Sequence, residues 1–422
     1  MTHSHRFGIA GLVLAAGASA TPTIEFLPPG YLATDASYDG SVLVGNVQGD
    51  GSFETFRWTA ETGVERLGRA TVPAIGVGGG SPDVSYDGTR VSASILSSDN
   101  LETQGIWDLE EGWTEAMPPP PPDGVILDQS YGSTWGLSGD GTTLTGFYWR
   151  MGPGSAKPNT WSQAGGITPL QSATGRSARV NAADFDADVV VGWEAAMDGV
   201  WQPAVWRGLV RSVLAQTPAG GQASGVTGDG ATIVGHSYNT ATLTMNAAIW
   251  RWNGSSYTTE LLGALPGTIF NSGSARLSSV ADSGELAGGT NLYTLNPGGP
   301  VDGVIWTPAT GLVKDTDWLA SLGLSVPPGS DIRDLNVVSP DGNVVVGIML
   351  TVDSGFQSFV VRLSNCPADV NGDEVVDFGD LNLLLGNYNT AGWGSPGDVN
   401  ADGVVDFSDL NTMLGAYNTT CP

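Results

Sequence analysis

A short pattern repeats through most of this 422-residue chain and sets the strongest limit on its fold. Each unit begins with Ser-x-Asp-Gly, continues with an apolar run that ends in Gly, and then reaches a Trp in a second apolar run. Asp-Gly pairs favour hairpin turns and β-branched runs favour strands, so each unit predicts several short antiparallel strands. Seven segments carry the leading motif or a degenerate form of it: 37–40, 85–88, 138–141, 186–188, 227–230, 282–284 and 339–342.

Repeats of roughly fifty residues built from short strands are typical of β-propeller blades. We therefore predict a mainly β chain in which residues 21–363 form a seven-bladed β-propeller. The first six units have a strand after the Trp, whereas the seventh ends near Leu363 without one. Thr23–Leu27 has the pattern of the missing strand. We expect it to complete blade seven and to remove an open strand edge.

Tryptophan occurs in two sets of positions. A Trp at one fixed position per blade predicts packing in the blade core rather than a sugar-binding platform. Trp residues outside that position are better candidates for an exposed ligand face. The repeat-position set is Trp58, Trp107, Trp161, Trp206, Trp250 and Trp306. The other candidates are Trp113, Trp135, Trp149, Trp193, Trp201 and Trp252.

Catalytic motifs are scarce in the repeats. The aspartates of the Ser-x-Asp-Gly segments are expected to form turns before they do chemistry. His236, the one histidine beyond the N-terminal segment, follows Gly235 at a strand end, so we expect a solvated or structural role. The sequence has no Gly-x-Ser-x-Gly elbow and no phosphate-binding loop. Paired carboxylates from distant blades stay open as an alternative, and we name no catalytic residue.

A thirteen-residue segment occurs twice near the C-terminus, at 369–381 and 398–410. Each copy places oxygen-bearing side chains at loop positions 1, 3, 5, 9 and 12, the spacing of an EF-hand-type calcium loop whose position 7 contributes a backbone carbonyl. We therefore predict two Ca²⁺ ions. The ligands of the first would be Asp369, Asn371, Asp373, Val375, Asp377 and Asp380. Those of the second would be Asp398, Asn400, Asp402, Val404, Asp406 and Asp409.

The two copies differ at position 6, where the loop turns sharply. Copy two has Gly403 there, whereas copy one has Glu374, and a non-glycine residue at positive φ costs about 1–2 kcal/mol. We predict that copy one is the weaker site. From Cys366 to the end the chain has acidic residues but no Lys or Arg, so it repels itself unless cations bind. The alternative is a pair of Asx-rich turns that bind no metal.

Each loop is followed by a helix signal, because apolar residues recur at i, i+3 and i+4. This doubled segment, residues 366–422, resembles a type I dockerin, the calcium-dependent module that docks onto cohesin domains in bacterial extracellular complexes. The resemblance implies a small all-α module with two calcium loops and a cohesin-like partner. The positions that read the partner in cellulosomal dockerins are Phe378-Gly379 and Phe407-Ser408 here, which departs from the family pattern. The apolar stripes are Leu381, Leu384 and Leu385, and Leu410, Met413 and Leu414.

The blade repeat also has a resemblance. Its Ser-x-Asp-Gly segment with an aliphatic run and a Trp strand resembles the HAF-type repeat of secreted bacterial proteins, which implies a propeller-like fold. The N-terminus agrees with export, because Arg6, an apolar run and Ala18-Ser19-Ala20 form a signal peptide over residues 1–20. We expect cleavage near Ala20 and a secreted protein. The apolar run is too short to span a membrane.

Cys366 and Cys421 are the chain's two cysteines, and they bracket the dockerin-like segment. In an exported protein this arrangement predicts a disulfide, with free thiols or a metal-binding pair as the alternative. The net charge of −27 excludes a nucleic-acid binder that relies on phosphate contacts.

We expect a secreted, monomeric binding or scaffolding protein whose C-terminal module docks, in a calcium-dependent way, onto a cohesin-like or cell-surface partner. The alternative is a polysaccharide-degrading enzyme, a glycosidase or lyase on the propeller, tethered through that module. A third hypothesis is that the paired loops only cap the end of the chain.

Overall fold

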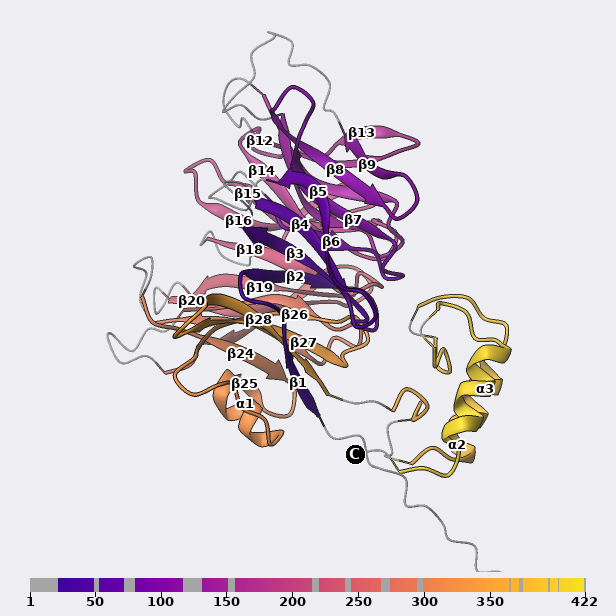
Figure 1. The fold of residues 1–422 in the computed structure, drawn as a ribbon. Helices are drawn as coiled ribbons and strands as arrows, with labels where there is room; N and C mark the ends of the chain where they lie inside the picture. The colour runs from indigo at the N-terminus through magenta and orange to yellow at the C-terminus, as the bar shows by residue number, and fades with distance from the viewer. Residues whose placement is uncertain are drawn as a thin grey trace, which may run out of the picture. The chain divides into compact units, whose positions relative to one another are not determined.

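The computed structural model describes most of the chain in two compact units. One unit is Pro22–Leu363, and the other contains Ser364–Pro422 (Figure 1). The described residues are 22–48, 53–71, 80–116, 131–150, 156–214, 220–239, 244–266, 274–293, 299–363, 366–371, 375–393, 395–400 and 402–420.

The first unit is a seven-bladed β-propeller of antiparallel blades, as the repeats predict (Figure 1). The first and second blades join into one sheet through the Thr71↔Ile95 pair. Blade one is β2 (Tyr31–Ala36), β3 (Val42–Gln48), β4 (Phe53–Thr59) and β5 (Gly63–Thr71). Blade two is β6 (Asp83–Val84), β7 (Arg90–Leu96), β8 (Glu102–Asp108) and β9 (Gly112–Ala116). Blade three is β10 (Gly132–Leu137), β11 (Thr143–Trp149), β12 (Ala156–Ser162) and β13 (Gly166–Pro169).

The next blades repeat this order, and the first strand of each is the innermost. Blade four is β14 (Ala178–Ala183), β15 (Val189–Ala195), β16 (Trp201–Arg207) and β17 (Val210–Val213). Blade five is β18 (Gly221–Val226), β19 (Thr232–Asn239), β20 (Thr244–Trp252) and β21 (Tyr257–Gly263). Blade six is β22 (Ser274–Val280), β23 (Ala287–Leu292), β24 (Val301–Thr307) and β25 (Gly311–Lys314). A short helix, α1 (Asp315–Ser321), follows it.

Blade seven joins the two ends of the propeller chain. It consists of β26 (Asp331–Val338), β27 (Val344–Thr351), β28 (Gly355–Arg362) and the N-terminal β1 (Thr23–Phe26). β1 pairs antiparallel with β28, and the Leu27 N–H donates to the Ser358 carbonyl at 3.0 Å. The prediction that this N-terminal strand completes blade seven is confirmed. The pairing covers an edge of β28 that would otherwise be open.

The Ser-x-Asp-Gly segments form the turns between the first and second strands. In blade one, the Ser37 hydroxyl donates to Asp39 Oδ1 at 3.1 Å and accepts from the Val42 N–H at 2.9 Å. Gly40 has φ +65°, a conformation that glycine adopts without strain. Blades two, three, five and seven show the same hydroxyl-to-aspartate bond. The aspartates are therefore turn formers, as predicted.

The repeat-position tryptophans pack in the blades. Trp206 and Trp250 are fully buried, and Trp58, Trp161 and Trp306 are at most 9% exposed. Trp107 is partly buried against the cluster around Val84 and Val91. Their prediction as core residues is confirmed.

The second unit has two helices, α2 (Phe378–Gly386) and α3 (Phe407–Ala416). Each begins with a capping box: Asp377 and Asp380 in α2, and Asp406 and Asp409 in α3. Antiparallel bridges join Val375 to Thr420 and Ala391 to Val404.

The core of this unit is small. Leu384 and Met413 are fully buried with Val376 and Val405. Leu385 and Leu414 are about half exposed, so the apolar stripes predicted for the helices are only partly covered. A unit of this size has too little facing surface to bury a wider stripe.

Candidate functional site

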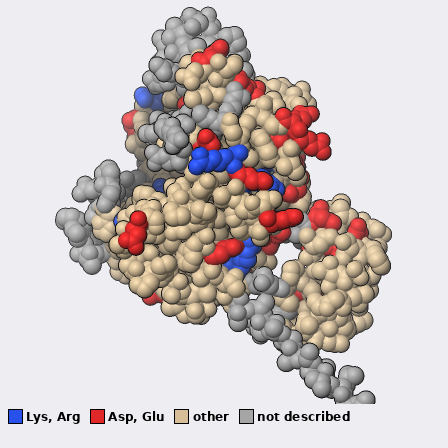
Figure 2. All heavy atoms as spheres, viewed as in Figure 1, with Lys and Arg blue, Asp and Glu red and all other residues tan. Residues whose placement is uncertain are grey.

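The innermost strands of the propeller line a cavity of about 370 Å³. The first strand of every blade contributes residues to its wall. Small-molecule sites occupy roughly 300–1,000 Å³, so the cavity can hold a small ligand. Figure 2 shows acidic side chains at several separate places on one face of the molecule, most of which is uncharged. Further charged groups, among them Asp35, Asp83 and Arg179, line the cavity inside the propeller.

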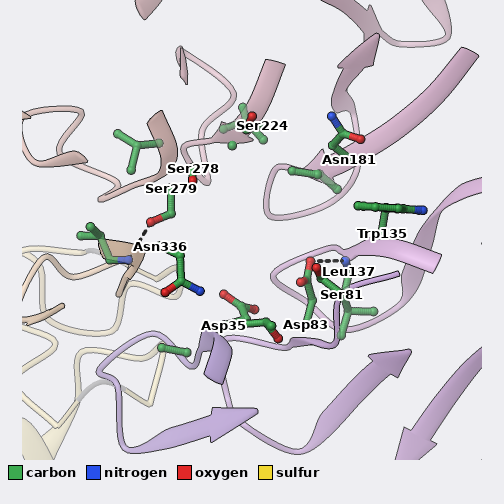
Figure 3. Close-up of a pocket in the computed structure, with 18 of the residues that line it drawn as sticks. Asp35, Ser81, Asp83, Trp135, Leu137, Asn181, Ser224, Ser278, Ser279 and Asn336 are labelled. Carbon is green, nitrogen blue, oxygen red and sulfur yellow. Dashed lines mark hydrogen bonds between the residues drawn. The ribbon is translucent and has the colours of Figure 1, made fainter. Parts of the chain in front are cut away.

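Irregularities in the inner strands aim polar side chains at the cavity. The strand register shifts around Thr34, Trp135, Asn181, Ser224 and Ser278. Each lies three residues before the first residue of its turn, which is Ser37, Ser138, Asp184, Thr227 or Ala281. A β-bulge of this kind re-aims a side chain, and all five residues line the cavity. Figure 3 shows the last four of them, with their neighbours, around the cavity.

Aromatic rings narrow one end of the channel. Tyr86 lies 5.4 Å from Tyr38 and 5.4 Å from Phe185, measured between ring centroids. The Tyr86 hydroxyl donates to Asp282 Oδ1 at 3.0 Å and thereby links blades two and six. A Cβ on Gly139 would lie 2.7 Å from the Phe185 ring, so glycine is needed there for the rings to meet.

Main-chain hydrogen bonds run from blade to blade at this same end. The N–H of Tyr38 donates to the carbonyl of Tyr86 at 2.9 Å, and that of Tyr86 donates to Gly139 at 2.8 Å. Asp341 donates to Tyr38 at 3.1 Å, which carries the ring across the junction of blades seven and one. These bonds hold the turns of successive blades in a fixed relation.

Two partly buried carboxyl groups line the cavity. Asp35 Oδ2 accepts from the Val84 N–H at 2.8 Å, and Asp83 Oδ2 accepts from the Leu137 N–H at 3.2 Å. Burial raises the pKa of Asp35 to about 7. Burial, and then the charge of Asp35, raise the pKa of Asp83 well above its usual value. Both side chains point into the cavity (Figure 3).

Blade four contributes a buried arginine to the wall of the same cavity. Arg179 is 3% exposed, and its guanidinium lies 3.4 Å from the centroid of the Trp135 ring. Its Nε donates to Asn181 Oδ1 at 2.7 Å, whereas its Nη1 has no partner among the described residues. Burial lowers the pKa of Arg179 to about 9, so the group is still charged at neutral pH. A second arginine of the wall, Arg276, pairs with Asp334 at 3.8 Å.

The structure also places His236 and the Trp residues that lie outside the repeat position. His236 is partly buried, and desolvation and then the charge of Arg276 lower its pKa to about 4, which agrees with a structural role. Trp193 is fully buried beneath Trp201, with the ring centroids 4.0 Å apart, so the expectation that it is exposed is wrong. Every residue of β15 is buried, which explains the difference. Trp201 is 39% exposed, and Trp135 lines the cavity.

In the C-terminal unit, the second acidic loop gathers three carboxylates. Oxygens of Asp398, Asp402 and Asp409 all lie within 4.8 Å of one another. Gly403 has φ +83°, as position 6 requires. Burial raises the pKa of Asp398 to about 6, and the nearby charges of Asp409 and Asp402 add to this effect. Backbone hydrogen bonds from Gly403 and Asp402 oppose it. This all-oxygen set suits a hard cation such as Ca²⁺.

The other three predicted ligands of the second loop are Asn400, Val404 and Asp406, and each makes a different contact. Asn400 Nδ2 donates to Asp402 Oδ2 at 2.9 Å, beside the carboxylate cluster. Asp406 caps α3 by accepting from the Ser408 N–H at 2.6 Å. Val404 forms the bridge to Ala391, and it is 40% exposed.

The first loop repeats part of this geometry. Asp380 Oδ1 accepts from the Asn371 N–H at 3.0 Å, and Oδ2 accepts from the Asp377 N–H at 2.8 Å. Asp373 and Glu374 lie outside the described residues, so the weaker first site stays a prediction. Cys366 is disulfide-bonded. Its predicted partner Cys421 also lies outside the described residues.

Seven blades around a polar cavity define a β-propeller with a candidate small-molecule site. No known protein family matches the sequence, and no curated protein matches it. Oligogalacturonate lyase in complex with manganese shares 14% identity over 83% of this chain and 99% of that chain, with a TM-score of 0.51. Acylaminoacyl peptidase shares 10% identity over 80% of this chain and 51% of that chain, with a TM-score of 0.50. These identities show the propeller fold alone. No helix in the described ranges is long and apolar enough to cross a membrane.

Proposed function

We propose that this protein is a secreted modular binding protein. Its propeller binds a small ligand in the central cavity, and its C-terminal unit binds calcium and docks onto another protein. The observation that carries the calcium part is the convergence of Asp398, Asp402 and Asp409 on one point of the second loop. Three carboxylates at that distance repel one another, and a divalent cation would relieve the repulsion.

A calcium titration of the whole protein tests this role. We expect saturable uptake by wild type, and loss of the tighter site in Asp409→Ala, because Asp409 joins the cluster to the start of α3. Asp108→Ala, which removes a carboxylate from the propeller's surface, is the control and should bind calcium as wild type does. Absence of uptake, or equal uptake by Asp409→Ala, would contradict the calcium proposal.

Two exposed phenylalanines support the docking part. Phe378 is 65% exposed and Phe407 is 69% exposed, at equivalent positions of the two helices. Exposed aromatic side chains of this kind often anchor protein interfaces. We expect calcium-dependent binding to a panel of cohesin domains or cell-surface proteins, and weaker binding by Phe378→Ser and Phe407→Ser. Binding that is unchanged by a chelator would show that docking does not depend on the loops.

The enzyme alternative has one specific observation in its favour. Asp35 and Asp83 are partly buried carboxyl groups with raised pKa values in one cavity, and such pairs serve as acid and base in glycoside hydrolysis. Assay of the protein on a polysaccharide panel tests it. Turnover that Asp35→Asn and Asp83→Asn abolish would establish the enzyme and displace the binding role.

A further inference from the structure

We infer that the central cavity binds a small carboxylate that also carries hydroxyl or ammonium groups, with its carboxylate held by Arg179. This inference deepens the binding role proposed for the propeller, and it does not depend on the calcium loops. The chemistry is common to sugar acids, hydroxy acids and amino acids. The argument rests on the arrangement of charge inside the cavity.

The first step is the unusual state of Arg179. Burying a guanidinium is costly unless it is paired, and buried arginines normally have a carboxylate partner. Among the described residues, Arg179 has no ion pair: its neighbours are Asn181, Trp135 and Trp193. Its Nη1 is buried and without a partner, and the residue lines the cavity. A carboxylate in the cavity would supply the missing charge and accept the free N–H.

The second step is the position of Arg179 in the repeat. It lies five residues before Asp184, the first residue of the blade-four turn, and the residues at the same spacing in blades five and six are Gln222 and Arg276. All three line the cavity. Three neighbouring blades therefore present N–H donors at one level of the channel. Because Arg276 already has Asp334 at 3.8 Å, Arg179 is the group most in need of an anion.

The third step is the carboxyl pair of blades one and two, which favours donor groups on the ligand. Asp35 and Asp83 lie three residues nearer the turns than that level, and Figure 3 shows them facing the cavity beside Asn336. Their oxygens accept hydrogen bonds from hydroxyl or ammonium groups. A simple inorganic anion would satisfy Arg179 but would offer no hydrogen-bond donor to these carboxyl groups. A carboxylate with donors at its far end satisfies both the arginine and the carboxyl pair.

The test compares acids with a neutral counterpart on the whole protein. Galacturonate, malate and glutamate represent the three sources, and galactose is the neutral match for galacturonate. Isothermal titration and thermal shift should show binding of at least one acid and no binding of galactose. In Arg179→Gln the dissociation constant of that acid should rise about tenfold or more, because a charge-assisted bond is lost.

A matched variant controls for damage to the fold. Arg207 also lies over an aromatic ring, 4.6 Å from the centroid of Trp252, but it does not line the cavity. Arg207→Gln should bind the acid as wild type does, and the melting temperature of each variant reports folding. Unchanged affinity in a folded Arg179→Gln would overturn the inference. Binding of galactose without any acid would overturn the ligand class and leave the binding role, whereas no binding by any probe would overturn both.

Discussion

At the residue scale, the fourth turn shows how a buried charge can replace a hydroxyl. Asp184 occupies the position of Ser37 in blade one, and its Oδ1 accepts from the Val189 N–H at 3.0 Å, as the serine does for Val42. Asp184 is 5% exposed. Burial raises its pKa from 3.8 to about 7, and the neighbouring Asp186 and Asp188 add to this effect. The turn is therefore made at an electrostatic cost.

This cost predicts a pH-dependent gain in Asp184→Asn, which keeps the acceptor oxygen. The folded pKa lies above the unfolded value, so the folded state binds the proton more tightly and stability falls as pH rises from about 4 to about 7. We expect Asp184→Asn to match wild type near pH 4 and to be more stable at pH 8, by on the order of 1–3 kcal/mol. Urea unfolding at both pH values measures it, with Asp353→Asn, an exposed aspartate of blade seven, as control. A loss of stability at pH 8 would contradict the assignment.

The sequence predicts residue roles unevenly. The spacing of the second loop predicts that its acidic side chains gather, and three of them, Asp398, Asp402 and Asp409, do converge. Arg179 could not be identified, because nothing local distinguishes it from a surface arginine. One local signal pointed to the cavity wall. Three residues before the first residue of each turn, blades one, three, four, five, six and seven have a polar or aromatic residue where an aliphatic strand residue would be expected.

At the element scale, the hairpin turns provide a matched pair of substitutions. Ala187 stands where the other turns have glycine, and it has φ +61°. Ala187→Gly should stabilise the propeller by about 0.5–1 kcal/mol, since relief of the left-handed strain exceeds the entropy lost by a more flexible unfolded chain. Thermal unfolding measures the change.

The reverse substitution in blade seven completes the pair. Gly342 has φ +80°, and a Cβ there would meet only the Ala281 Cβ at 3.4 Å, so no severe clash obscures the result. Gly342→Ala should destabilise by about the same amount. If both substitutions lowered the melting temperature, backbone strain would not be the controlling factor at these turns.

The strands were predictable as elements, whereas their bulges were not. Asp-Gly turns, β-branched runs and a Trp at one repeat position in six of the seven units define the blades from local signals. A bulge depends on the register between two strands, as at Trp135 between Thr134 and Gly136, and register is a property of the assembled sheet. The bulges place the cavity's side chains, so the site itself was not visible in the sequence.

At the scale of the whole molecule, the stability of the closed propeller should depend on the hydrogen bonds between β1 and β28. Leu27 donates to Ser358, and hydrogen-bonded pairs alternate along antiparallel strands, so Glu25↔Val360 is also a hydrogen-bonded pair whereas Phe26↔Phe359 is not. Glu25→Pro should therefore destabilise the propeller more than Phe26→Pro, by about 1–3 kcal/mol.

Denaturant unfolding of the two proline variants measures this difference. Glu25 also pairs with Arg362 at 3.3 Å, so Glu25→Gln is needed to separate the ion pair from the main-chain bond. We expect Glu25→Gln to cost little, because exposed ion pairs contribute about 0–1 kcal/mol. Equal stability of the two proline variants would show that ring closure does not require the β1 hydrogen bonds.

The central claim is that a propeller which needs no metal is joined to a C-terminal unit which calcium stabilises. Hydrogen exchange of the whole protein, with calcium and with a chelator, tests it most directly, because metal-binding energy is folding energy in small metal-binding units. We predict that the chelator increases exchange over 366–422 and leaves the strands of 22–363 unchanged. Exchange that is unchanged over 366–422, or that rises in the blades as well, would contradict the claim.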